Sequence, residues 1–165
     1  MLLGMRRRFE PFVLDGSKTH TIRNKRKAPR RRPEPGDLCN VYGDSRQKTM
    51  HLLGRWPCTR VEDIRIEAHF GPWRIPLSVD IWIDGEQLSM SEVNRLCWVD
   101  GFRASDEENA WFDFAEYWGK SSRIPKTAGC LGFTGDLIHW DYAHPVQWAK
   151  KPRKRAAAAA QRRCA

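Results

Sequence analysis

The sequence of 165 residues lacks paired cysteines and long apolar runs. Its five cysteines are odd in number and widely scattered, and neither a Cys-x-x-Cys pair nor histidines at metal-ligand spacing accompany them, so we expect reduced thiols and no metal site. No segment approaches the roughly 18 to 20 apolar residues of a membrane span, and the stretch from Met1 to Met5 is too short for a signal-peptide core. These absences predict a cytoplasmic protein that uses no membrane anchor, and no motif points to a cofactor.

Acidic residues are scarce at the two ends of the chain. Residues 6–32 carry eleven Lys or Arg against two acids, and residues 150–163 carry seven with no acid, whereas the stretch between them is net acidic by seven. A net charge of +9 that is concentrated in this way predicts binding to a polyanion. For the C-terminal tail, the alternative is a solvated segment that binds polyanions without selectivity.

The length and the 41% of hydrophobic residues predict one domain with its own core. We divide the chain into a basic lead over residues 1–8, a folded domain over residues 9–148, and a basic low-complexity tail over residues 149–165 that should be disordered when free. No internal repeat is present.

Hydrophobic periodicity predicts a helical turn, then several strands, two helices and a closing strand. Residues 9–16 form the turn, and alternation predicts strands near residues 19–23, 38–41, 60–68 and 79–83, the last followed by an Asp84-Gly85 hairpin turn. Capping boxes at residues 89–92 and 105–108 begin two helices, and residues 130–133 and 137–140 give strands divided by Gly135. This order predicts an α+β fold around a small β-barrel.

Polar residues are densest from Lys18 to Arg23. Because side chains alternate along a strand, Thr19, Thr21 and Arg23 should share one face, opposite His20. Lys18 lies beside other cations, which disfavour its charged form and suit it to act as a base. The alternative is that the cations are ordinary surface charges and the threonines are strand formers.

Three blocks of sequence resemble the ASCH domain, a relative of the PUA domain. They are Gly16-Ser-Lys-Thr-His-Thr-Ile-Arg23 with the later Pro35-Gly36-Asp37, then Asp100-Gly101-Phe102 before an acidic and aromatic helix, and finally the closing run from Phe133 to Trp140. The resemblance spans about residues 9 to 140. It implies a PUA-like, partly open β-barrel with flanking helices, a cleft beside the Gly-x-Lys-Thr segment, and a role in RNA binding or RNA metabolism.

Some compact members of the family hydrolyse N4-acetylcytidine, and others are described as ribonucleases. Carried over by position, the resemblance implies a catalytic set of Lys18 as base, Thr21 as nucleophile and Asp100 to orient Lys18, with Asp100 standing where the family has Glu. An aspartate is one methylene shorter, so its reach to Lys18 is in question. The ligand would be bound by residues of the same segment and the following loop: Thr19, Arg23, Lys25 and Arg26.

Three functions are therefore open. The first is binding of RNA or a modified nucleoside in the cleft, with DNA as an alternative partner; the second is hydrolysis, by an amidohydrolase or a ribonuclease; the third is non-catalytic docking on nucleic acid through the tails. Cleft models predict that Lys18→Ala abolishes function, whereas the tail model predicts this for deletion of residues 150–165. The sequence leaves the oligomeric state open.

Overall fold

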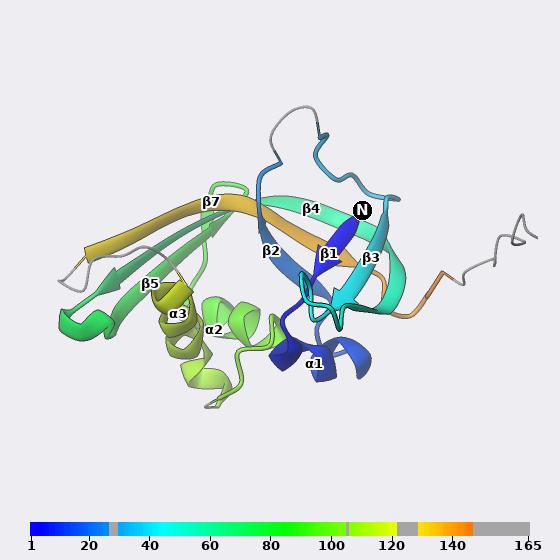
Figure 1. Ribbon diagram of the computed structural model, residues 1–165. Helices are drawn as coiled ribbons and strands as arrows, with labels where there is room; N and C mark the ends of the chain where they lie inside the picture. The colour runs from blue at the N-terminus through cyan, green and yellow to red at the C-terminus, as the bar shows by residue number, and fades with distance from the viewer. Residues whose placement is uncertain (27–29, 105, 122–128, 147–165) are drawn as a thin grey trace, which may run out of the picture.

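The computed structural model describes residues 1–26, 30–104, 106–121 and 129–146, and within these ranges the fold is α+β (Figure 1). The expected tail of residues 149–165 lies outside the described residues. The strands are β1 (Leu2–Gly4), β2 (His20–Asn24), β3 (Leu38–Gly43), β4 (His51–Phe70), β5 (Pro76–Ile83), β6 (Glu86–Gln87) and β7 (Gly129–Trp140). The α-helices are α1 (Glu10–Leu14), α2 (Met90–Val99) and α3 (Ala110–Ser121), and short 3-10 helices are η1 (Arg7–Phe9), η2 (Pro72–Arg74) and η3 (Glu107–Asn109). Among the described residues, no helix is long and apolar enough to cross a membrane.

One seven-stranded sheet contains all the described strands, and the 20-residue β4 is the central strand that pairs with three others. The sequence predicted a strand only over residues 60–68. In the structure β4 pairs with β3 near its start and with β5 near its end, while β7 runs antiparallel along most of its length. The register shift between Cys58 and Arg60 marks a bulge, which lets one long strand bend and change partners.

The predicted division of the last strand at Gly135 is wrong, because β7 runs unbroken from Gly129 to Trp140. A Cβ atom at Gly135 would overlap the carbonyl oxygen of Arg23 in β2. Glycine is therefore needed here for the close approach of two backbones rather than for a turn.

Five strands form a curved layer in the order β1-β3-β4-β7-β2, which leaves β1 and β2 as its two edges. Nη2 of Arg23 in β2 donates a hydrogen bond to the carbonyl oxygen of Gly4 in β1. Since no ladder joins these edges among the described residues, the Arg23 side chain links them across the opening. The layer is thus an incompletely closed barrel, as the α+β prediction anticipated.

Two hydrophobic clusters lie along the sheet. One packs α2 and α3 against β4, β5 and β7, and its largest buried side chains include Phe70, Phe102 and Phe114. The other fills the curved layer between β1, β3 and the ends of β4 and β7, where Trp56 stacks near Trp140 and Tyr142. Figure 1 shows the helices gathered on one side of the long β4–β7 pair.

The signals that start the helices are only partly those predicted. At α2 the capping box is confirmed, because the Ser89 hydroxyl accepts from the Glu92 N–H and the Glu92 carboxylate accepts from the Ser89 N–H. Before α3 the cap is Asp106, whose carboxylate accepts from the Asn109 N–H. Ser105, the predicted cap, lies outside the described residues. The hairpin turn is also confirmed, with positive φ at both Asp84 and Gly85.

Candidate functional site

Lys18 and Asp100 meet in the interior although 82 residues separate them. Lys18 follows α1 and is fixed by its N–H, which donates to the carbonyl of Phe12 at 2.7 Å. Asp100 is the C-cap of α2, and the following Gly101 has a φ of +96°, which ends the helix in the usual way. Lys18 Nζ donates to the backbone carbonyl of Asp100 at 2.6 Å and also to its carboxylate. An aspartate at this position therefore does reach Lys18.

Burial dominates the electrostatics of this pair. The side chains are 2% and 9% exposed, and this desolvation lowers the pKa of Lys18 and raises the pKa of Asp100, against the opposing attraction between the two charges. The sequence correctly predicted a lowered lysine pKa but named the wrong main cause, since Arg23 contributes less than burial does. A lysine with a lowered pKa loses its proton at a lower pH than an exposed lysine does, which suits it to act as a base.

His20 is the polar neighbour that the sequence treated as an ordinary strand residue. It is buried in β2, and its Nε2 lies 3.8 Å from Asp100 Oδ1, beyond hydrogen-bond distance. Nε2 has no hydrogen-bond partner in the structure. A buried polar atom without a partner is costly, so His20 offers an unused hydrogen-bonding group directly beside the Lys18–Asp100 pair.

A second polar group extends from His20 across the sheet. His139 in β7 is the register partner of His20, with ring centroids 5.3 Å apart, and its Nε2 lies 2.7 Å from Glu62 Oε2. Arg60 pairs with the same carboxylate oxygen at 3.1 Å. The sequence gave no sign of this group because the pairing of β2, β7 and β4 depends on a register that local alternation does not specify.

The threonines predicted to face a ligand lie differently. Thr21 is buried, and its partner in β7 is Ile138, which belongs to the cluster inside the curved layer. Thr19 is half-buried, and Arg23 is engaged with Gly4 as described above. Among the described residues no hydrogen bond joins Thr21 to Lys18 or Asp100. Lys18 and Asp100 are thus brought together, whereas Thr21 belongs to the opposite strand face from His20.

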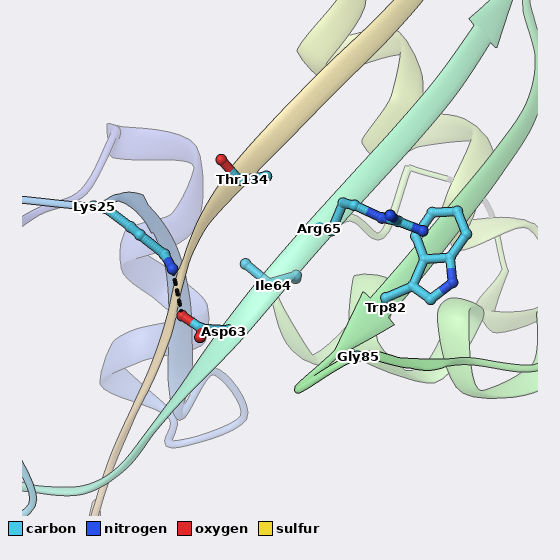
Figure 2. Close-up of a pocket in the computed structure, with 7 residues that line it drawn as sticks. All are labelled: Lys25, Asp63, Ile64, Arg65, Trp82, Gly85 and Thr134. Carbon is cyan, nitrogen blue, oxygen red and sulfur yellow. Dashed lines mark ion pairs between the residues drawn. The ribbon is translucent and has the colours of Figure 1, made fainter.

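Lys25 and Arg26 are exposed, and Lys25 lines a shallow pocket on the sheet face away from the helices (Figure 2). The pocket measures about 240 Å³ and includes Arg65, whose guanidinium lies 3.8 Å from the centre of the Trp82 ring.

Ion pairs hold part of the basic loop against the sheet. Lys25 Nζ is 2.7 Å from Asp63. Arg32 of the same loop binds Asp63 and the buried Asp136, each at 2.9 Å. The carboxylates of Asp63 and Asp136 therefore neutralise part of the basic loop that the sequence predicted.

A different set of arginines lies nearer Lys18. We define the arginine–aromatic surface as Arg6, Arg8 and Arg103 with the rings that they contact: Phe9, Phe12, Trp98, Phe102 and Tyr117. The guanidinium of Arg8 lies 4.9 Å from the Phe9 ring centre, and Lys18 Nζ lies 5.2 Å from the same centre. Phe9 therefore connects the exposed arginines to the buried pair, a relation that the sequence did not reveal.

We expect His20 to make the protein less stable in mild acid. Burial, and next the charge of Lys18, hold the pKa of His20 well below 6.5. As pH falls below about 6.5, His20 in the unfolded chain binds a proton but His20 in the folded chain does not. The free energy of unfolding therefore decreases by up to about 1.4 kcal/mol per pH unit. Urea unfolding between pH 7 and pH 5 should show a smaller loss for His20→Leu than for the wild type. Exposed His144→Leu serves as the control, and parallel wild-type and His20→Leu profiles would contradict this assignment.

Comparison of the chain with protein-family models, with curated proteins and with solved structures gave no significant match.

Proposed function

We propose that this protein is an ASCH-like, PUA-like domain that binds RNA or a modified nucleoside at the arginine–aromatic surface, above the Lys18–Asp100 pair. The observation that carries the proposal is the arrangement of the exposed guanidinium groups of Arg6 and Arg8 on aromatic rings directly beside the buried Lys18–Asp100 pair. Arginines supply contacts to phosphate, and guanidinium planes together with the half-buried rings of Phe12, Trp98 and Tyr117 supply stacking for unpaired bases.

The buried polar residues Lys18, His20 and Asp100 would supply the hydrogen bonds that distinguish one base from another. Phosphate contacts are largely independent of sequence, whereas hydrogen bonds to base edges discriminate between bases. His20 Nε2 is an unsatisfied group from which such a bond could form once a covering side chain moves, because His20 is 4% exposed. Its neighbours Lys18 and Asp100 add a donor and an acceptor, and burial lowers the pKa of Lys18 and raises the pKa of Asp100.

The test is fluorescence anisotropy of a labelled single-stranded RNA titrated with wild type and Arg6→Gln/Arg8→Gln. Each phosphate contact in a single strand contributes about 0.7 to the slope of log K against log salt, so loss of both arginines should reduce the slope by roughly 1.4. The matched control is Arg95→Gln, because Arg95 is exposed, pairs with Glu107 and is not one of the arginines that define the surface.

An unchanged affinity and slope in the double variant would contradict the proposed surface. If deletion of residues 150–165 removes binding while the double variant retains it, the contact is made by the tail instead. Running the same titration with single-stranded DNA decides which nucleic acid is preferred, because the 2′-hydroxyl is the group that distinguishes them.

The Lys18–Asp100 contact favours a second candidate, an amidohydrolase acting on an N-acylated cytidine-type nucleoside. Neutral Lys18 would accept the hydroxyl proton of Thr21 as Thr21 Oγ1 bonds to the acyl carbon, and would return that proton to the departing amine nitrogen as the C–N bond breaks. Water would then hydrolyse the acyl ester and release the carboxylic acid. Because Lys18 is 1% exposed, this chemistry requires a covering side chain to move and Thr21 to turn toward Lys18.

A further inference from the structure

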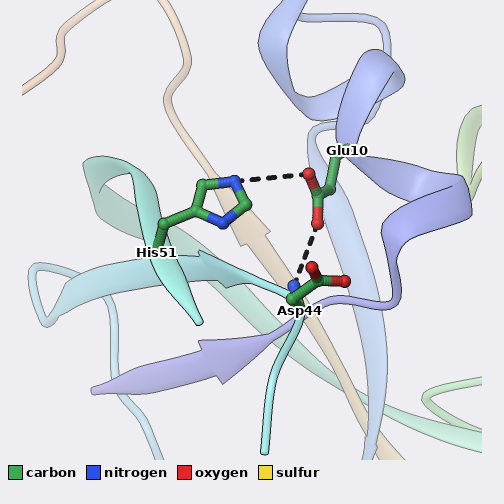
Figure 3. Close-up of side chains that lie close together, drawn as sticks. All are labelled: Glu10, Asp44 and His51. Carbon is green, nitrogen blue, oxygen red and sulfur yellow. Dashed lines mark hydrogen bonds and ion pairs between the residues drawn. The ribbon is translucent and has the colours of Figure 1, made fainter. Parts of the chain in front are cut away.

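Glu10, Asp44 and His51 gather on the side of α1 that faces the β3–β4 connection (Figure 3). One carboxylate oxygen from each acid and one ring nitrogen of His51 all lie within 4.8 Å of one another. Glu10 comes from α1, Asp44 follows the last residue of β3, and His51 is the first residue of β4. They are separate from the Lys18–Asp100 pair and from the arginine–aromatic surface.

The hydrogen bond of His51 fixes which nitrogen is available. Its Nδ1 lies 3.0 Å from the carbonyl oxygen of Thr49. A carbonyl only accepts, so Nδ1 carries the hydrogen of this bond and the lone pair of the neutral ring is on Nε2. Nε2 faces Glu10 Oε2 at 3.3 Å. In the neutral ring a nitrogen lone pair and a carboxylate oxygen face each other, an arrangement that a cation between them satisfies, whereas a protonated ring donates Nε2–H to Glu10.

The spacing suits a small cation. Donor atoms at about 2.0 to 2.1 Å around tetrahedral zinc are roughly 3.3 to 3.4 Å apart, and the Nε2–Oε2 separation is 3.3 Å. Histidine ligands of metals usually donate the other ring N–H to a carbonyl, as His51 does to Thr49. The orientation of His51 is therefore the one seen in metal sites, and the three donor atoms would close from within 4.8 Å of one another around the cation.

The surrounding groups hold the acids in place. Glu10 Oε1 accepts from the Asp44 N–H at 2.9 Å, and Asp44 Oδ2 accepts from the Thr49 hydroxyl at 2.9 Å. A Cβ atom at Gly43 would overlap Glu10 Oε1 and would lie 2.8 Å from His51 Cε1. Only glycine at position 43 lets both side chains occupy this space.

We propose that Glu10, Asp44 and His51 form a binding site for a divalent transition-metal cation, with Zn²⁺ as the probe. One imidazole and two carboxylates give three protein ligands and leave a fourth position for water or another ligand. The nitrogen ligand favours a transition metal over Mg²⁺ or Ca²⁺, which prefer oxygen. This site departs from the expectation of no metal, because the ligands lie 34 and 7 residues apart along the sequence and match no spacing motif.

The test is isothermal titration of the untagged, metal-free, full-length protein with Zn²⁺, followed by the absorption spectrum of the Co²⁺ form. We expect one equivalent to bind, and His51→Ala and Asp44→Asn each to weaken binding at least tenfold, since loss of a supporting residue alone costs about 10- to 100-fold. His69→Ala is the matched control, because His69 is an exposed histidine of the same strand. Asn tolerates the left-handed backbone of Asp44, whose φ is 47°.

The Co²⁺ spectrum separates this site from the cysteines. Nitrogen and oxygen ligation gives d–d bands without the intense near-ultraviolet band of a cobalt–thiolate bond. Equal affinities for wild type and His51→Ala would overturn the proposal, as would a thiolate band at the first equivalent or no binding of Zn²⁺ by the wild type. In any of these cases Glu10 and His51 form only an ion pair.

Discussion

Replacing Asp100 by alanine should lower the free energy of unfolding by about 3 to 5 kcal/mol, because it leaves the charge of Lys18 buried without its partner. Lys18 is 1% exposed, and its other hydrogen-bond acceptor is the backbone carbonyl at position 100, which the substitution leaves in place. One neutral acceptor does not replace a carboxylate in a site from which water is excluded. Urea unfolding monitored by tryptophan fluorescence gives the measurement.

The control variants separate an unpaired charge from lost packing. Glu86→Ala removes an exposed carboxylate in β6 and should change stability by less than about 0.5 kcal/mol. The double variant Lys18→Met/Asp100→Leu removes both charges and substitutes apolar side chains of similar shape, and should recover most of the loss, as replacement of buried ion pairs often does. A cost below about 1 kcal/mol for Asp100→Ala, or a double variant as unstable as the single one, would show that the pair is not held as an ion pair.

If the amidohydrolase candidate is right, Lys18→Met should slow the release of acetate from N4-acetylcytidine by about 10²- to 10⁴-fold, the usual contribution of a positioned general base. The expected cause is the loss of the amine that accepts the Thr21 proton. Released acetate and cytidine are measured by chromatography. Lys120→Met, which removes an exposed lysine at the end of α3, should retain the wild-type rate.

Two further variants keep this result separate from misfolding and from RNA binding. Thr21→Val preserves the shape of a buried side chain and should lose activity without unfolding the domain. If neither Lys18→Met nor Thr21→Val slows acetate release, the catalytic assignment is wrong. If the wild type releases no acetate but still binds RNA, the amidohydrolase candidate fails while the arginine–aromatic surface stands.

Local sequence signals predicted much of the secondary structure. The helical turn before Gly16, the capping box at Ser89 and the hairpin at Asp84-Gly85 each depend on backbone preferences and hydrogen bonds within a few residues. Such signals are readable because both partners lie close together in the chain. Gly135 was misread for the same reason, since its true constraint is the backbone of β2, more than a hundred residues away.

The candidate site divides in a similar way. The resemblance placed Lys18 and Asp100 in one set, and the structure shows them in contact. It also grouped Arg23 with the ligand-binding residues, whereas the structure uses this side chain to join the edges of the barrel through Gly4. The order of residues in a strand gives the residue type and the face on which it lies. It does not specify which groups of a distant strand that side chain will contact.

The sequence by itself predicted that the fold is α+β and showed that the cationic residues are gathered at the ends of the chain. It also singled out Lys18 as the lysine whose pKa should be lowered. Only the tertiary structure decided that burial, more than neighbouring charge, perturbs Lys18, that His20 and His139 face each other, and that Glu10, Asp44 and His51 converge. The physical reason is that desolvation, strand register and the meeting of distant side chains are properties of the packed chain. Composition and periodicity report only the local preferences from which that packing begins.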